Sequence, residues 1–484
     1  MCVYTFLRIH RRKGAPKKGS ISMASHSGKF HISHSVDLTE GSIVRGLIAF
    51  AVPMFLGQLL QQFYNMTDAW VVGNFASNDA FAAVSLSGNL VFLIIGLFNG
   101  IAVGGGVVIS RFYGARDKDG IERSIHTNFL FGIIASVIST IVGLIITPYL
   151  LKWMNTPDSV MPDATAYFSI YFAGVSTAIM YNTCMAIMRA VGDSLHPLYY
   201  LIVSSLSNVV LDLLFVAVFH WSAGGAALAT VIAQALSVVL CLWRMCHASD
   251  ATRLHLSKLR LRGNGAIMRE IIRQGLPTGI QNCVISIGNM VIQANINTFG
   301  AYAISGHGAY AKLEGFAFLP ITNVAMSLPT FVSQNLGAGK WERARRGSII
   351  GIAAGCIAAE LLGVIMFLLA PQGMRIFTSS AEAIEYGVIH MRITAFFFFL
   401  LAYAHCVAGV MRGCGKSIIP MTTMLVCWCG IRIIYVTLAL RVVYAYQTIA
   451  WAYPLTWGLS VIAFTVCLLR LDWRQLAQER LVKS

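Results

Sequence analysis

Apolar stretches long enough to cross a lipid bilayer recur along almost the whole chain. A helix needs about 20 predominantly apolar residues to span the hydrocarbon core, and a segment in lipid must satisfy its backbone groups internally, which favours helices. Twelve such stretches are predicted, near residues 46–72, 80–108, 127–151, 164–189, 196–219, 225–246, 271–298, 302–330, 348–370, 385–411, 418–440 and 447–469. The sequence therefore predicts an all-α, polytopic membrane protein with twelve transmembrane helices.

The composition excludes several other classes of protein. Hydrophobic residues make up 57% of the chain and charged residues 12%, whereas a soluble domain carries about 25% charged residues. A chain of 484 residues with so few charges cannot build a polar surface. This excludes an ordinary soluble enzyme, a disordered protein and a secreted disulfide-rich scaffold.

The basic residues indicate the orientation of the chain. There are 36 Lys and Arg against 20 Asp and Glu, a net charge of +16. With both termini inside, 30 basic residues fall on inner segments and four on outer segments, while Lys312 and Arg432 lie within spans. Short inner loops of membrane proteins carry the excess of Lys and Arg. We therefore expect a multi-pass protein of the cell (inner) membrane with cytoplasmic termini, and the basic excess does not indicate nucleic-acid binding.

The two halves of the chain repeat each other. Matched positions 223 or 224 residues apart are Pro53 with Pro277, Ser110 with Ser333, Gly114 with Gly337, Arg189 with Arg412, and Pro197 with Pro420. Six spans in each half give a parallel repeat, with a substrate site expected between the lobes. The predicted domains are a disordered cytoplasmic tail (1–41, where Met23 is a possible alternative start), an N-lobe (42–246), a cytoplasmic linker (247–270), a C-lobe (271–469) and a cytoplasmic tail (470–484).

Acidic residues inside spans are the strongest candidates for function, because they are costly in a membrane. Four occur: Asp68, Asp212, Glu314 and Glu360. Asp68 ends a polar stripe with Gln58, Gln61 and Asn65, at steps of 3, 4 and 3 that place all four on one helix face. Asn208 precedes Asp212 by one helical turn, and Thr230 lies in the next span.

These acids support two kinds of cation coupling. Oxygen ligands from Asp68, Asn208, Asp212 and Thr230 suit Na⁺, and two neighbouring carboxyl groups can instead share a proton. The alternative is that each acid caps a helix or pairs with a buried base. That alternative is favoured for Glu314, because Lys312 is close in the same span, and both readings stay open for Glu360.

The second half keeps the polar stripe but not its acid. Its stripe comprises Asn282, Ser286, Asn289, Gln293 and Asn297, and Ile292 occupies the position that matches Asp68. Cation coupling is therefore expected in the first lobe, with neutral polar groups of the second lobe facing substrate. The predicted substrate-cavity residues are Gln58, Gln61, Asn65, Asn282, Asn289, Gln293 and Glu314.

Motifs for other chemistry fail on inspection. Gly415-Lys416-Ser417 looks like the end of a phosphate-binding loop, but that loop needs Gly at position 410, which is Val. The His and Cys residues show no metal-ligand spacing. We expect no catalytic residues, no cofactor beyond a coupling ion, no bound nucleotide and no enzyme activity.

Several motifs together resemble the MATE (multidrug and toxic compound extrusion) family over about residues 45–470. They are Pro53 through Asp68-x-x-x-x-Gly73, the two Ser-x-x-x-Gly-Ala inner loops, Arg189-x-x-Gly192-Asp193-Ser194, Asn208-x-x-x-Asp212 and Gly225-Ala226-Ala227-x-Ala229-Thr230. The resemblance implies two six-helix lobes arranged as a V. Its bacterial DinF-like and MepA-like subgroup implies a first-lobe cation site at Asp68, Asn208, Asp212 and Thr230, and a switching bend at Pro53. The NorM-like acids of the seventh and tenth helices are missing, so a second-lobe cation site is not expected.

The leading hypothesis is a secondary active antiporter that exports amphipathic, cationic organic compounds in exchange for H⁺ or Na⁺. The alternatives are a flippase for lipid-linked precursors, which would need cationic groups such as Lys312 and Arg432 to face an anionic headgroup, and a channel. Small-molecule substrates and membrane lipid are the expected partners, and the expected state is a monomer.

Overall fold

The computed structural model describes residues 36–153, 156–248, 252–256, 259 and 264–479. Within these ranges helices form all of the regular secondary structure. The first half contains α1 (Ile43–Phe75), α2 (Asn78–Gly114), α3 (Lys118–Trp153), α4 (Met161–Ala173), α5 (Val175–Ala190), α6 (Leu195–Asp212), the π-helix η1 (Leu213–Val218) and α7 (Ser222–Cys246). The second half contains α8 (Gly265–Asn297), α9 (Ala301–Gly337), α10 (Trp341–Leu368), α11 (Ala370–Arg375), α12 (Ala381–Ala395), α13 (Phe398–Gly413), α14 (Ile418–Met424), the π-helix η3 (Leu425–Ile431), α15 (Arg432–Val442), α16 (Tyr446–Leu469) and α17 (Trp473–Gln478).

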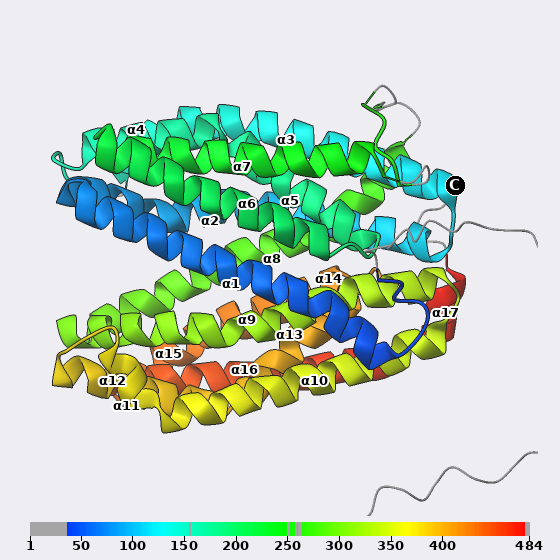
Figure 1. Cartoon of the computed structure of the whole chain (residues 1–484). Helices are drawn as coiled ribbons and strands as arrows, with labels where there is room; N and C mark the ends of the chain where they lie inside the picture. Colours follow the sequence, from blue (N-terminus) through cyan, green and yellow to red (C-terminus); the bar gives the residue numbers. More distant parts are fainter. Residues whose placement is uncertain (1–35, 154–155, 249–251, 257–258, 260–263, 480–484) are drawn as a thin grey trace, which may run out of the picture. The chain divides into compact units, whose positions relative to one another are not determined.

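The helices reproduce the internal repeat of the sequence. The pairs α2 and α9, α3 and α10, and α5 and α13 each begin 223 residues apart, and α1 and α8 begin 222 residues apart. The helices α3 to α7 lie on one side and α9 to α16 on the other (Figure 1). The structure therefore confirms an all-α fold built from two related halves.

Each predicted span coincides with a helix or with a bent pair of helices. Eight described helices are individually long and apolar enough to cross a membrane, and two bent pairs, α4 with α5 (44°) and α12 with α13 (57°), raise this number to ten. Helices α2 and α8, which have 37 and 33 residues, occupy the two remaining predicted spans. The two bends fall at Gly174 and Phe397, which are 223 residues apart, so even the broken spans belong to the repeat.

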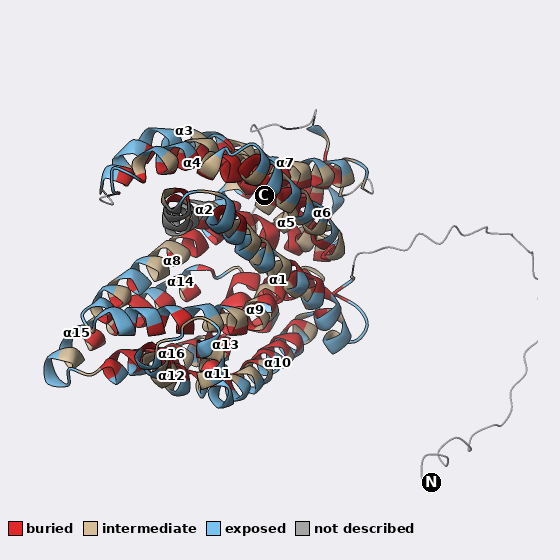
Figure 2. Ribbon diagram, turned by 60° about the vertical axis from the view of Figure 1, so that its left-hand side comes forward, coloured by how far each residue is buried: buried red, intermediate tan, exposed pale blue. Residues whose placement is uncertain are grey.

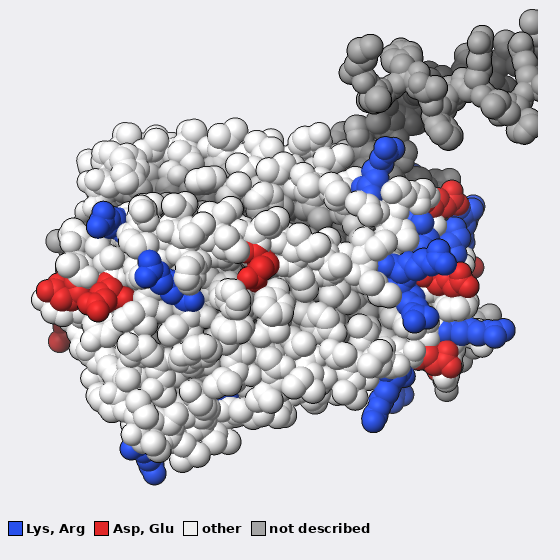
Figure 3. All heavy atoms as spheres, turned by 90° about the horizontal axis from the view of Figure 1, so that it is seen from below, with Lys and Arg blue, Asp and Glu red and all other residues white. Residues whose placement is uncertain are grey.

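The side chains are distributed as a membrane requires. Buried residues face neighbouring helices and exposed residues face outward (Figure 2). Many of the outward residues are large and apolar, for example Leu206, Val210 and Ile462, each more than 60% exposed. Lys and Arg gather mainly at the end where α17 lies, and the middle of the face in Figure 3 is nearly free of charge. An apolar surface of this extent needs lipid to cover it.

The described chain begins and ends at that same basic end. Arg343 at the start of α10 donates hydrogen bonds to the carbonyl oxygens of Glu40 (2.7 Å) and Gly41 (2.8 Å). Arg111 at the end of α2 donates to the carbonyl oxygen of Glu479 (3.1 Å), just after α17. Residues 36–41 are therefore held against the helices, whereas residues 1–35 and 480–484, including Met23, lie outside the described residues.

Glycines let the two halves approach closely. A Cβ atom on Gly100 of α2 would overlap the backbone of Gly279 of α8, and one on Gly279 would overlap the backbone of Leu97. Nearer the basic end, a Cβ on Gly114 would overlap Gln334, and one on its repeat partner Gly337 would overlap Arg111. The halves are thus in backbone contact toward the basic end.

Candidate functional site

A polar cluster forms where α1, α6 and α7 of the first half meet. Asn208 and Asp212 lie one turn apart on the buried face of α6, and both are almost fully buried. With its nitrogen turned toward Asp212, the Asn208 amide donates to Asp212 Oδ2 (2.8 Å) and accepts from the backbone N–H of Thr230 (3.2 Å). The amide therefore links the carboxylate of α6 to the backbone of α7.

Asp68 joins this cluster from α1. Its carboxyl group lies within hydrogen-bond reach of the side chains of Asp212 and Thr230. Oδ1 of Asp68 and Oδ1 of Asp212 are both buried, and neither has a hydrogen-bond partner among the described residues. The structure therefore brings together the four residues that the sequence proposed for cation coupling.

The cluster offers oxygen atoms and negative charge in a confined space. Two carboxylates at such close range repel unless a proton or a cation lies between them, and an unpaired buried oxygen is costly. A proton shared by the pair and a Na⁺ ion held by the carboxylate and hydroxyl oxygens both satisfy these conditions. In the residues that the structure describes, no group of three or more His, Cys, Asp or Glu side chains is arranged to hold a metal ion.

Tyr64 is a member of the cluster that sequence reasoning missed. Its hydroxyl donates to Thr230 Oγ1 (3.1 Å), and it lies one helical turn before Asp68 on α1. The signal was present in the spacing, because residues four apart share a helix face. An aromatic residue in an apolar span is more often a packing residue, so its hydroxyl gave no reason to select it.

The predicted substrate-cavity residues do not meet in one described pocket. Gln58 Oε1 accepts from Asn323 Nδ2 of α9 (2.9 Å), and Asn282 Nδ2 donates to the Gly96 carbonyl of α2 (3.4 Å), so both lie in contacts between the halves. Gln61, Asn65 and Asn289 are exposed, and Gln293 bonds to Asn297 on its own helix (2.9 Å).

The other two acids of the spans have different surroundings. Glu314 accepts a hydrogen bond from Tyr310 (2.8 Å), while the ammonium of Lys312 lies 5.4 Å from the ring centroid of Phe377. Glu360 Oε2 accepts from the backbone N–H of Phe399 (3.3 Å) in the first turn of α13. The bend before α13 leaves such N–H groups without a helical partner, so Glu360 caps a broken span. The proposed hinge residue, Pro53, is buried in the continuous helix α1.

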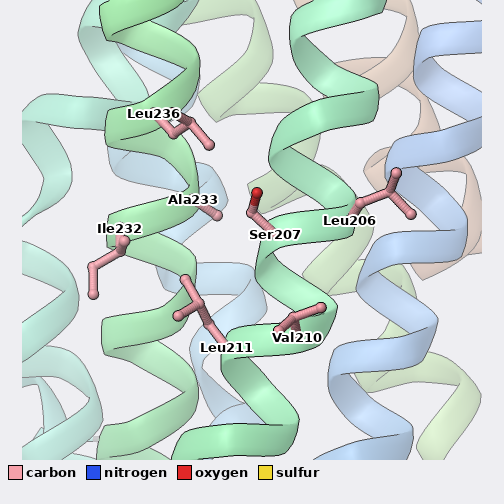
Figure 4. A pocket seen from close by; sticks show the side chains of 7 residues that line it. All are labelled: Leu206, Ser207, Val210, Leu211, Ile232, Ala233 and Leu236. Carbon is pink, nitrogen blue, oxygen red and sulfur yellow. The ribbon is translucent and has the colours of Figure 1, made fainter.

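A pocket of about 540 Å³ lies between α6 and α7, and its lining includes none of the four residues proposed for cation coupling. It is lined by Leu206, Ser207, Val210, Leu211, Ile232, Ala233 and Leu236 (Figure 4). Ser207 supplies its polar side chain, and Leu206 and Val210 are among the most exposed apolar residues of α6. This pocket belongs to the lipid-facing surface rather than to the polar cluster.

A comparison with known families reproduces the division of the chain into two halves. A family model described as MatE matches residues 53–214 and 277–438, one segment in each half. The chain is 25% identical over 382 residues to the probable multidrug resistance protein YpnP of Bacillus subtilis (79% of this chain, 85% of the relative). It is 23% identical over 434 residues to the multidrug export protein MepA of Staphylococcus saprophyticus (89% and 93%).

Solved structures share the fold. A crystal structure of a MATE protein in complex with MaL6 superimposes with a TM-score of 0.84 at 20% identity, and the match covers 92% of this chain and 99% of that one. Since the family model matches well over half of the chain, the chain belongs to the MATE family and is a multi-pass membrane transporter.

Proposed function

We propose that this transporter exports amphipathic, cationic organic compounds in exchange for H⁺ or Na⁺. The observation that carries the proposal is the buried Asp68–Asp212 pair, in which one oxygen of each carboxyl group has no partner among the described residues. A coupling ion at this pair relieves the repulsion and occupies the free oxygens. Each net charge that the exchange moves inward supplies about 2.3 kcal/mol per 100 mV of membrane potential.

The basic end of the molecule is proposed to face the cytoplasm, in agreement with the positive-inside rule. Helix α1 starts at that end with Ile43, and Asp68 lies seven residues before its other end at Phe75. At 1.5 Å per residue, Asp68 is roughly 10 Å from the far end of the helix. The pair therefore lies in the outer part of the membrane, where it can take up an ion from outside.

Helix α1 provides a route from ion binding to movement of the halves. The same helix carries Asp68 at the ion pair and Gln58 in the contact with Asn323 of the second half. Pro53, between that contact and the basic end, removes one backbone hydrogen bond and allows the helix to bend. A bound ion shifts the equilibrium between two arrangements of the halves only as far as its affinity for them differs. In this proposal, the bend of α1 is the difference between the two arrangements.

Two comparisons support the substrate class. YpnP is named a probable multidrug resistance protein and MepA a multidrug export protein. The flippase alternative is less well supported, because it needs cations that face an anionic headgroup. Arg432 is instead buried with its guanidinium bonded to Thr456 (2.9 Å), and Lys312 lies beside Phe377.

Efflux of a fluorescent organic cation from proteoliposomes tests the proposal, with a pH gradient and a Na⁺ gradient imposed separately. One of the two gradients is expected to drive efflux by the wild type. Asp68→Asn and Asp212→Asn are expected to lower gradient-driven efflux at least about tenfold, which corresponds to about 1.4 kcal/mol. Glu360→Gln is the matched control, because this acid of a span caps α13 and an amide oxygen can accept the same bond. Undiminished gradient-driven efflux by Asp68→Asn would falsify the proposal.

A further inference from the structure

A second cluster of ionisable side chains lies within the second half, separate from the Asp68–Asp212 pair. Glu314 belongs to the inward stripe of α9, which also contains Ala303, His307, Tyr310 and Ala317 at alternating steps of four and three. The Tyr310 hydroxyl donates to Glu314 Oε1 (2.8 Å). A carboxyl group thus faces the interior of the second half, although the acids of the seventh and tenth helices that the NorM-like pattern requires are missing.

Two histidines lie next to Tyr310. The ring of His390, from α12, is fully buried and packs 4.1 Å from the Tyr310 ring and 5.0 Å from the His307 ring. Nε2 of His390 and Nδ1 of His307 are buried and have no hydrogen-bond partner among the described residues. Unpaired buried nitrogens are costly, and a functional role is one explanation for their presence. Imidazole is the side chain best suited to relay protons near neutral pH.

Arg432 limits which ion this cluster can bind. It is almost fully buried, donates to Thr456 Oγ1 through Nε (3.1 Å) and Nη2 (2.9 Å), and lies 4.5 Å from the Tyr453 ring. Its charge acts on Glu314 through space. A fixed positive charge that acts on the carboxylate repels Na⁺ and can balance the carboxylate once its proton has left. The chemistry therefore favours a proton over a metal cation.

A π-helix adjoins the buried charged residue in each half. Segment η1 starts directly after Asp212, and η3 ends directly before Arg432. These two segments do not lie at matching positions of the repeat. Because π-helical segments are rare and are often found at functional sites, η3 is a second indication that the region around Arg432 is functional.

A pocket connects this cluster to the surface opposite the basic end. It has a volume of about 510 Å³, and its lining includes the acids Glu382 and Glu385 and the phenols of Tyr302, Tyr386, Tyr444 and Tyr446. Tyr446 lines the pocket and also places its hydroxyl 3.1 Å from Nδ1 of His390. Hydrogen bonds thus join Tyr446 to His390 and Tyr310 to Glu314, and the rings of His390 and Tyr310 are in contact between these two links.

We propose that Glu314 is a proton-binding site of the second half, loaded from the acidic pocket through Tyr446, His390 and Tyr310. A proton from water in the pocket adds to the Tyr446 oxygen, whose own proton passes to Nδ1 of His390. The ring of His390, which contacts the Tyr310 ring, then rotates to bring its unpaired Nε2–H to the Tyr310 oxygen, and the hydroxyl proton of Tyr310 forms the new O–H bond on Glu314. Each relay group keeps its number of protons, and Glu314 gains one.

The groups around Glu314 define its response to pH. Those that interact with Glu314 or with its partners are His307 and Tyr310 of α9, His390 of α12, Arg432 of α15, and Tyr446 and Tyr453 of α16. From α10 and α13, Glu360 and His405 make other contacts, to the Phe399 N–H and to the rings of Phe318 and Trp428. The positive charge of Arg432 therefore influences how readily Glu314 releases its proton.

Under the proposed function, on which this coupling step rests, binding of an organic cation displaces the proton from Glu314. The number of protons released on binding is measured for the protein in lipid nanodiscs, with tetraphenylphosphonium as the probe, from the enthalpy in buffers of different ionisation heat. Glu314→Gln is expected to release about one proton fewer than the wild type. Glu360→Gln, the matched acid of a span, is expected to match the wild type.

An infrared pH titration tests the site independently of transport. The wild type should show a protonated carboxyl component that disappears as the pH rises, and Glu314→Gln should lose this component while any band of the Asp68–Asp212 pair remains. Tyr446→Phe keeps Glu314 and removes only the hydroxyl at the pocket, so it should slow the growth of the Glu314 component after a pH drop by about tenfold and leave its final amplitude unchanged. A titrating band of full size in Glu314→Gln overturns the inference, and so does proton uptake by Tyr446→Phe at the wild-type rate.

If Asp68→Asn keeps normal coupling, the proposed function fails, while the infrared titration still decides the role of Glu314.

Discussion

At the scale of single residues, the oxygens of the Asp68–Asp212 pair differ in whether they have a hydrogen-bond partner. Asn208 satisfies Asp212 Oδ2, whereas Oδ1 of both carboxyl groups is left for an ion. Burying an ionised carboxylate is expensive unless it is paired and hydrogen-bonded. Hydrogen bonds within the protein therefore hold the geometry of the site, and the two unpaired oxygens remain available for a ligand.

A substitution at Tyr64 tests how far the geometry of the ion site depends on the hydrogen bond between Tyr64 and Thr230. Tyr64→Phe removes the hydroxyl that donates to Thr230 Oγ1 and keeps the ring. The loss of one hydrogen bond is worth about 0.5–1.5 kcal/mol, so the apparent affinity for the coupling ion should fall by roughly two- to tenfold. The measurement is the dependence of the efflux rate on ion concentration. Tyr149→Phe, at an exposed position, is the control and should leave the dependence of the efflux rate on ion concentration unchanged. If Tyr64→Phe also leaves it unchanged, the hydrogen bond to Thr230 does not contribute to ion binding.

The residues of the first-lobe cluster could be selected from sequence because charge in an apolar span is rare and its spacing is readable. Asp68, Asn208, Asp212 and Thr230 do meet in the structure, although their role in coupling remains a proposal. Tyr64 and the capping role of Glu360 escaped selection for a physical reason. Both depend on which backbone or side-chain atoms another helix presents, and that information is tertiary.

At the scale of helices, the crossing of α2 and α8 sets how closely the two halves approach. Gly279→Ala adds a methyl group that overlaps the Leu97 backbone. Such overpacking costs about 1–3 kcal/mol, because a backbone cannot move aside as a side chain can. The thermal unfolding midpoint in the absence of substrate should therefore fall by several degrees.

Gly308→Ala is the matched control for that substitution. Gly308 is also a helical glycine, but a Cβ atom there has no neighbour within 4 Å. In a helix interior, replacing Gly by Ala stabilises by up to about 1 kcal/mol, so the midpoint of the control should stay level or rise. Equal midpoints for the two variants would mean that α2 and α8 do not hold the halves at this distance.

The helices themselves were largely predictable, since every predicted span lies on a helix or a bent pair of the structure. The chain can cross the membrane only where an apolar stretch is long enough to span it as a helix, and such stretches are visible in the sequence. The π-helices η1 and η3 were not predictable, because their hydrogen-bond pattern depends on local packing around Asp212 and Arg432. The short helix α17 also escaped, since six residues are too few to show a helical period.

At the scale of the whole molecule, two terminal segments join the halves at the basic end. The N–H of Val36 donates to the carbonyl oxygen of Gly192 in the first half (3.0 Å), while Arg343 of the second half holds Glu40 and Gly41. At the other terminus, α17 packs against α10 of the second half, and the carbonyl oxygen of Leu476 in α17 accepts a hydrogen bond from Arg111 of the first half. An alternating-access cycle that opens this end has to release these contacts.

Exchange of an organic cation for an ion at Asp68–Asp212 is tested most simply by using the gradient of the organic cation, in place of the ion gradient, as the driving force. Coupling between two ligands is reciprocal, so a gradient of the organic cation alone should drive the coupling ion the opposite way. Proteoliposomes loaded with the cation are diluted, and indicators inside report pH and Na⁺. The account predicts ion influx in the wild type with one of the two indicators, at least about tenfold faster than in Asp68→Asn. Exit of the cation from wild-type vesicles with no ion influx, or equal influx in Asp68→Asn, would contradict it.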